Sequence, residues 1–291
     1  MTMHPITKQS ALSLALPMFL FLVPATTWAS EVGAGFSLAV QYKQLEMEQR
    51  FTGLNLLTNS NATDGDLKAS LPVATLQGIL FFKQFYTVLK VENTLSESSV
   101  DSSIPFTTEG TSLSTDVLRN DISLVLGYNL NDTFSVFTGY MQGLTELTPD
   151  ACRDVTCTNA ASVMLQDDDQ EYTQRYEEKG FFVGVGAGWR VGSGKVSASL
   201  AYAYMDGEYS DNYHDAFGSS EFDYEGKSKG TSTSLAWTAP LNEYLFYFVD
   251  GRAQFYSMDA KDTTGLPSFE GSEVATDETI LGLSAGLQVI F

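Results

Sequence analysis

His214 and the acids beside it are the residues best suited to acid–base chemistry in this chain. The sequence has two histidines, His4 and His214, and Asp211 precedes His214 by three positions. An imidazole and a carboxylate within hydrogen-bond reach of one water can act as general base and orienting acid. A hydrolytic site at Asp211 and His214 is therefore one hypothesis, and its geometry depends on the elements that carry these residues.

The two cysteines and the acidic clusters offer other chemistry. The chain has an even number of cysteines, Cys152 and Cys157, and its leader predicts export to an oxidising compartment. Both observations favour one disulfide between the two cysteines. Two cysteines and a single histidine beyond the leader cannot fill a tetrahedral zinc site without carboxylates. Residues 167–169 and 64–66 carry oxygen ligands suited to calcium, but without the spacing of an EF-hand loop. We expect a disulfide, solvated acidic loops, and no metal or cofactor.

The first 29 residues have the three parts of a secretory signal peptide. Lys8 lies in the n-region, residues 11–23 form a short apolar core, and Thr27 and Ala29 occupy the −3 and −1 positions. We predict cleavage after Ala29, with one mature domain over residues 30–291.

Composition and charge exclude several classes of function. The formal net charge is −20, which argues against nucleic-acid binding because that requires clustered basic residues. The chain is 12% aromatic and 18% charged, and no apolar run of about 18 residues follows the leader. A helical membrane protein is therefore excluded, whereas membrane-crossing strands are compatible with these values.

The C-terminal segment predicts an amphipathic β-strand. Apolar residues occupy every second position from Leu281 to Phe291, and the other face carries mainly small or polar residues. The same alternation recurs along the chain. It predicts about ten strands, within a range of roughly eight to twelve, over residues 32–49, 74–82, 87–92, 119–128, 134–140, 181–191, 196–204, 234–239, 247–255 and 279–291.

Short turns alternate with long polar connections between these strands. Turns are predicted near residues 83–84, 129–132, 192–195 and 240–243, and long loops over 51–68, 96–112, 147–174, 210–220 and 261–271. Each apolar stretch has about the 9–11 residues that a tilted strand needs to cross a bilayer. A soluble β-sandwich is the alternative, but it does not explain this alternation of connections.

This pattern resembles that of Gram-negative outer-membrane β-barrels. In that family a terminal aromatic residue, preceded by apolar residues at alternate positions, is read by the barrel-insertion machinery, and Leu287, Val289 and Phe291 match it. The resemblance implies an all-β fold, a closed antiparallel up-and-down transmembrane barrel in the outer membrane. It also implies outer-membrane lipid, lipopolysaccharide and the insertion machinery as partners.

Strand alternation assigns a set of charged residues to the barrel interior. A barrel of this size is largely filled by its own side chains, so we expect ion pairs that pack the lumen, with a narrow ion-conducting pore as the alternative. The residues of this predicted network are Lys43, Lys90, Glu92, Arg119, Asp121, Glu178, Arg190, Asp250 and Arg252.

In size and topology the chain is similar to the omptins, ten-stranded surface proteases. Omptins use an Asp-x-His pair in the fourth outer loop and an Asp-x-Asp pair in the second. His214 falls in the fourth long connection, but Asp211 is one residue too far away, and residues 96–112 contain Asp101 without an Asp-x-Asp. A phospholipase or deacylase would need a histidine in the barrel wall, and none lies in a predicted strand.

We therefore predict a structural or surface-interaction barrel, adhesin-like, with long acidic outer loops that bind an external ligand. A narrow porin-like channel and an omptin-like surface protease are the two alternatives.

Overall fold

The structure is a computed structural model that describes residues 32–52, 62–103, 112–149, 171–215, 218–264 and 271–291. The predicted signal peptide, Cys152, Cys157 and the acidic residues 167–169 lie outside the described residues. All regular elements in the described ranges are β-strands: β1 Val32–Thr52, β2 Ala62–Phe82, β3 Phe85–Thr94, β4 Ser98–Ser103, β5 Ser112–Asn129, β6 Phe134–Pro149, β7 Glu171–Val191, β8 Gly194–Asp215, β9 Gly218–Pro240, β10 Leu245–Asp262 and β11 Glu273–Ile290. Among these residues no helix is long and apolar enough to cross a membrane.

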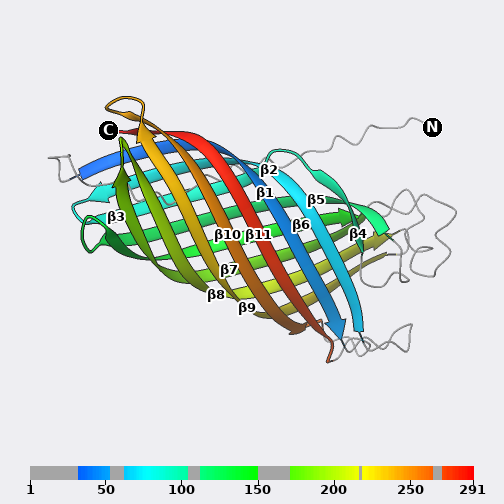
Figure 1. Ribbon diagram of the computed structural model, residues 1–291. Coiled ribbons are helices and arrows are strands. Elements are labelled where there is room, and N and C mark those ends of the chain that lie inside the picture. Colours follow the sequence, from blue (N-terminus) through cyan, green and yellow to red (C-terminus); the bar gives the residue numbers. More distant parts are fainter. Residues whose placement is uncertain (1–31, 53–61, 104–111, 150–170, 216–217, 265–270) are drawn as a thin grey trace, which may run out of the picture.

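The strands close into one antiparallel barrel (Figure 1). The strands pair with their neighbours in chain order, except that β3 and β4 each pair with β2 and β5 and not with each other. Strand β1 pairs with both β2 and β11. The ends join at Phe291, whose N–H donates to Ala34 O and whose carbonyl accepts from Ala34 N, both at 2.9 Å. The barrel has ten positions because β3 and β4 share the place between β2 and β5. The predicted fold class is confirmed.

The short strand β4 lies inside the stretch 96–112 that we predicted to be a loop, so that prediction is wrong for residues 98–103, whereas 104–111 lie outside the described residues. Leu95 N donates to Pro72 O at 2.8 Å, but Pro72 has no N–H to return the hydrogen bond. The regular pairing of β2 with β3 ends at the adjacent pair, Val73 with Thr94. The strand is interrupted at residues 95–97 and resumes as β4, which pairs with β5 from Ser98 onward.

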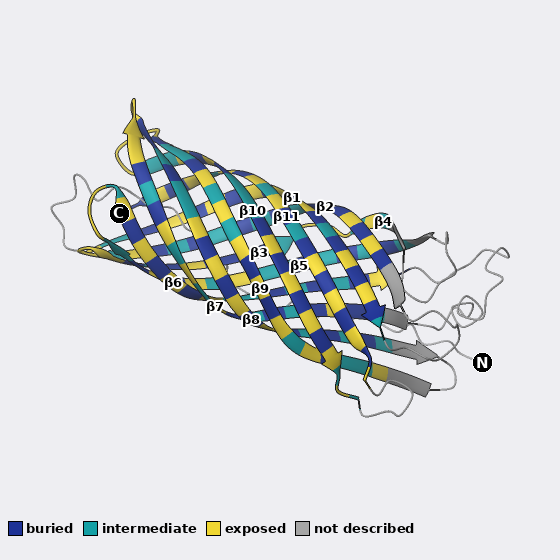
Figure 2. Cartoon of the chain, turned by 60° about the horizontal axis from the view of Figure 1, so that its bottom comes forward, coloured by how far each residue is buried: buried dark blue, intermediate teal, exposed yellow. Residues whose placement is uncertain are grey.

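The polarity of the two faces reverses along the barrel. On β1, Phe36, Leu38, Val40 and Tyr42 face outward and are exposed, as residues in contact with lipid are. Beyond Tyr42 the outward residues are polar, whereas the inward residues become apolar. Figure 2 shows the alternation of buried and more exposed positions along the strands, and on β1 this alternation continues through the reversal.

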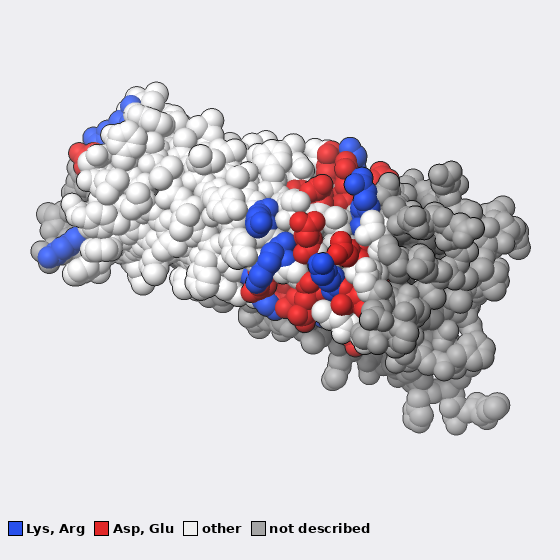
Figure 3. Space-filling model, turned by 90° about the horizontal axis from the view of Figure 1, so that it is seen from below, with Lys and Arg blue, Asp and Glu red and all other residues white. Residues whose placement is uncertain are grey.

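We call the two regions the membrane-spanning part and the outer wall. The outer wall comprises residues 43–52, 62–71, 98–103, 112–120, 141–149, 171–180, 205–215, 218–230, 256–262 and 273–280. Charged side chains gather in a band over this region, next to the residues that are not described, and the face beyond the band is white until its far end (Figure 3). The outer wall thus has the pattern of a water-soluble barrel, polar outside and apolar inside.

The strands are longer than predicted because they continue into the outer wall. The predicted loops at 51–68, 147–174 and 210–220 are correspondingly too long, since β2 begins at Ala62, β6 ends at Pro149 and β8 ends at Asp215. At the other end the tight turns are as predicted. Asn131 Oδ1 accepts hydrogen bonds from Thr133 N and Phe134 N, both at 2.9 Å, which fixes the turn before β6.

Candidate functional site in the barrel interior

Lys43 is the centre of a buried ion-pair layer at the boundary between the membrane-spanning part and the outer wall. Its Nζ lies 2.8 Å from Glu92 Oε2 and 2.5 Å from Asp121 Oδ2, and its side chain is only 2% exposed. Lys90 Nζ lies 2.5 Å from Glu92 Oε1. Strands β1, β3 and β5 supply these residues, which alternation places inward. Each buried charge therefore has an opposite charge beside it, as burial requires.

Arg119 extends this layer across the lumen. Its Nε lies 3.0 Å from Asp121 Oδ1, and its Nη1 donates to Thr145 Oγ1 at 2.9 Å. The same nitrogen pairs with Glu278 on β11, which is not a neighbour of β5 in the barrel. Glu278 was missing from the predicted network. Glu278 is an even number of residues away from Ser284 and Gln288, which face inward on the same strand. The alternation of the closing strand could therefore have identified Glu278 as an inward residue.

The other predicted network residues take different positions. Glu178 accepts a hydrogen bond from Ser228 Oγ at 2.5 Å, and Asp250 accepts one from Ser284 Oγ at 3.4 Å. Burial raises the pKa of Glu178, which lies in the outer wall, despite that hydrogen bond. Arg252 is half-buried, whereas Arg190 is exposed near the turn that ends β7. The structure therefore places Arg190 outside the buried layer.

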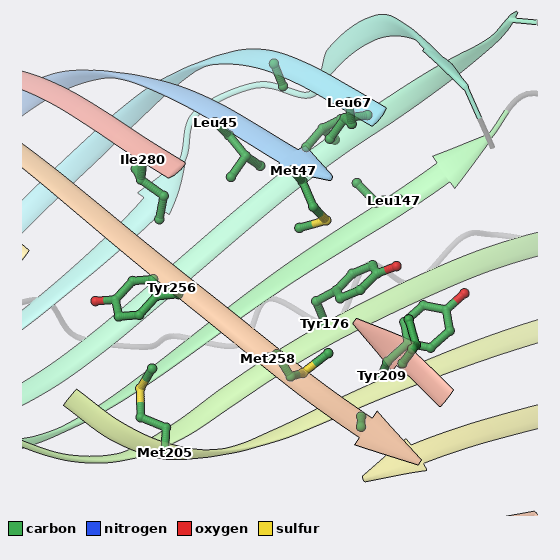
Figure 4. Close-up of a cluster of buried hydrophobic side chains, with 14 of the residues drawn as sticks. Leu45, Met47, Leu67, Leu147, Tyr176, Met205, Tyr209, Tyr256, Met258 and Ile280 are labelled. Carbon is green, nitrogen blue, oxygen red and sulfur yellow. The ribbon is translucent and has the colours of Figure 1, made fainter. Parts of the chain in front are cut away.

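An apolar layer fills the interior of the outer wall, beyond the ion pairs (Figure 4). Side chains from most strands of the barrel meet in it, and the largest are Leu45, Met47, Phe51, Leu67, Leu71, Leu147, Tyr176, Met205, Tyr209, Tyr224, Tyr256, Met258 and Ile280. The Phe51 and Tyr209 rings lie edge to face with centroids 5.5 Å apart, and the Tyr176 and Tyr209 centroids are 4.7 Å apart. Sequence reasoning missed this layer.

The tyrosine hydroxyls in the apolar layer are hydrogen-bonded. Tyr209 OH donates to Asp211 Oδ2 at 3.1 Å, and Ser272 Oγ donates to Tyr224 OH at 3.3 Å. Gln49 Nε2 donates to Tyr176 OH, and burial holds the pKa of Tyr176 well above its usual value. Strands β1 and β7, which carry Gln49 and Tyr176, stand five positions apart in the ring of ten. Side chains from opposite walls thus touch.

Asp211 and His214 both lie in strand β8, and the His214 side chain is outside the part of the chain that the structure describes, so the predicted pair stays a prediction. His214 lies in strand β8, opposite Glu171 and Ser219, so the prediction that no histidine lies in a strand is wrong. Asp211 is buried and engaged with Tyr209. Asp101 lies in β4. In the ranges that the structure describes, no group of three or more histidine, cysteine or acidic residues is placed to hold a metal.

Asp223 on β9 is an outer-wall acid with a raised pKa. Burial is the main cause, and the carboxylates of Glu221, Glu225 and Glu208 add to it. When the pKa of a carboxyl is higher in the folded state than in the unfolded state, the folded protein loses stability as the pH rises above the unfolded-state pKa, which is about 3.9 for aspartate.

The substitution Asp223→Asn should therefore stabilise the barrel at pH 7, by at most about 1 kcal/mol because the group is partly in water. At pH 3 it should have little effect. Urea unfolding of the refolded protein at both pH values measures this difference, and an equal effect at the two values would contradict the proposed cause.

Comparison with known proteins supports the fold. No protein-family model matches the sequence, and no curated protein matches it either. Among solved structures, the outer-membrane protease OmpT from Escherichia coli superposes with a TM-score of 0.61 at 13% identity, over 89% of this chain and 97% of that chain. A FadL homologue from Pseudomonas aeruginosa gives a TM-score of 0.33 at 11% identity, over 89% of this chain and 90% of that chain. The superposition on OmpT shows that the chain has the fold of a Gram-negative outer-membrane β-barrel of omptin-like size.

Proposed function

We propose that this protein is a non-conducting barrel of the Gram-negative outer membrane, which presents its outer wall and outer loops for surface interactions. The contact between Gln49 and Tyr176 carries the non-conducting part of the proposal, because it joins opposite walls inside the apolar layer. The Arg119–Glu278 pair spans the lumen in the layer beneath. An ion would have to displace both layers to pass.

The outer wall carries charges of both signs in regular rows. One row crosses four neighbouring strands as Lys179, Asp206, Lys227 and Asp259, with register pairs between successive members. Lys227 pairs with Asp206, and Lys179 Nζ lies 2.7 Å from Glu208 Oε1. Opposite charges in adjacent positions stabilise a sheet in water. This supports an outer wall that stands outside the bilayer, where a partner can reach it.

The loops are the second part of the proposed interaction surface. An adhesion assay tests this role: a non-adherent Gram-negative strain would display the full chain or a variant with residues 151–169 replaced by a short Gly-Ser linker. We expect the variant to lose adhesion to surfaces that the full chain binds, while its band on an unheated gel still shows a folded barrel. Equal adhesion of the full chain, the variant and a strain without the protein would contradict the proposal.

A protease is an alternative with less support, because Asp211 accepts a hydrogen bond from the Tyr209 hydroxyl. Hydrolysis of a peptide library by the full chain, abolished in His214→Ala, would favour it over the surface-interaction role.

A further inference from the structure

Several buried side chains in the membrane-spanning part have polar atoms without a hydrogen-bond partner in the described part of the chain, and four of these side chains lie close together: Gln41, Thr75, Gln77 and Gln288. Both polar atoms of Gln77 and of Gln288 lack one, as do Gln41 Oε1 and Thr75 Oγ1. These side chains are at most 2% exposed. An amide offers two donor hydrogens and one acceptor oxygen, so leaving both ends unpaired is costly.

The four side chains lie together on three adjacent strands. Gln77 on β2 and Gln288 on β11 both pair in register with Ser37 on β1, which lies between them. Thr75 and Gln41 lie one and two inward positions further toward the outer wall. Two positions that flank one strand are about 9.5 Å apart. One or two water molecules can bridge such a gap, and buried water commonly serves groups of this kind.

We propose that the interior of the membrane-spanning part binds water molecules on β1, β2 and β11, held by Gln77 and Gln288, and that this hydrated site ends at the ion-pair layer. The boundary follows from the chemistry on its outer side. Beyond Lys43 and Glu92 the interior is mainly apolar; Gln49 Nε2 there donates to Tyr176 OH, and Thr276 Oγ1 is a buried atom without a hydrogen-bond partner in the described part of the chain. Water therefore occupies the part of the inner lumen along β1, β2 and β11, beside the buried apolar clusters around Phe137 and Phe248, and the apolar layer of the outer wall excludes water.

This inference deepens the proposed function and rests on it only for the exclusion of water from the apolar layer. Water-edited solid-state NMR of the refolded full chain, labelled with ¹⁵N-glutamine in lipid bilayers, tests it. We expect magnetisation to pass from water to the side-chain amides of Gln77 and Gln288 as fast as to the exposed Gln44. Transfer to Gln49, in the apolar layer, should be several-fold slower. The variants Gln77→Leu and Gln288→Leu assign the signals.

Each outcome has a separate meaning. Transfer to Gln77 and Gln288 as slow as to Gln49 would overturn the water site, and the two amides would then pair directly across Ser37. Fast transfer to Gln49 would overturn the exclusion of water from the apolar layer, and with it the proposed non-conducting function, while the water site would stand. If a leucine variant does not fold, sequential backbone assignment of the wild-type protein provides the same comparison.

Discussion

Replacing Lys43 with methionine is expected to destabilise the barrel by about 3–5 kcal/mol. The ammonium of Lys43 lies within 2.8 Å of both Glu92 and Asp121, and methionine would leave these two carboxylates facing each other in a buried layer. Removing one member of a buried ion pair costs more than the pair contributes, because the remaining charge stays desolvated. The measurement is urea unfolding of the refolded chain in lipid vesicles, followed by tryptophan fluorescence.

The matched control is Lys68→Met. Lys68 Nζ lies 3.2 Å from Glu46 Oε1, and both side chains are well exposed on the outer wall. Exposed ion pairs contribute about 0–1 kcal/mol, so this variant should unfold nearly as the wild type does. If Lys43→Met and Lys68→Met lost the same small amount of stability, the ion-pair layer would not be an organising feature of the interior.

Phe51→Ala should cost about 3–5 kcal/mol as well, for a different reason. Phe51 is 1% exposed and its ring contacts Tyr209 and Tyr224 edge to face. Its removal leaves a cavity in the apolar layer, which β1, β8 and β9 hold at fixed spacing. The loss should therefore appear in the same urea titration, even though Phe51 lies far from the membrane-spanning part.

The variant Phe51→Leu tests whether the loss of stability in Phe51→Ala comes from the cavity or from any change at this position. Leucine keeps most of the apolar volume, so it should cost less than about 1.5 kcal/mol. A loss in Phe51→Leu as large as that in Phe51→Ala would point to the ring contacts themselves. A negligible loss in both variants would mean that the outer wall contributes little to the stability of the barrel.

The membrane-spanning part was predictable from the sequence because lipid imposes one simple rule on it. Apolar residues must face outward at every second position, as Phe181, Val183 and Val185 do on β7. The turns at Asn131 and Asn242 were also predictable, because an asparagine side chain that accepts backbone hydrogen bonds is a local turn signal. The number of strand positions and the order of the strands follow from these two patterns together.

The outer wall could not be found by the same rule, because its polarity is reversed. Between residues 65 and 71 the inward Leu67, Ala69 and Leu71 alternate with polar residues, but this alternation sits in a stretch with the composition of a loop. In β9 the inward face includes Gly226, Ser228 and Gly230, which carry no apolar signal. The length of these strands depends on hydrogen-bonded pairing between distant segments and not on a local pattern. In the same way, the position of Glu278 depends on its ion pair with Arg119, which is distant in the sequence.

The measurement that most directly tests the central claim, a closed lumen, is single-channel conductance of the refolded chain in a planar lipid bilayer. We predict no conductance steps from protein that shows the heat-dependent gel shift of a folded barrel, because the ion-pair and apolar layers join opposite walls. Steady, ion-selective steps from the same preparation would contradict the account. They would show that the charged residues around Lys43 line an open path, and the protein would then be a narrow channel.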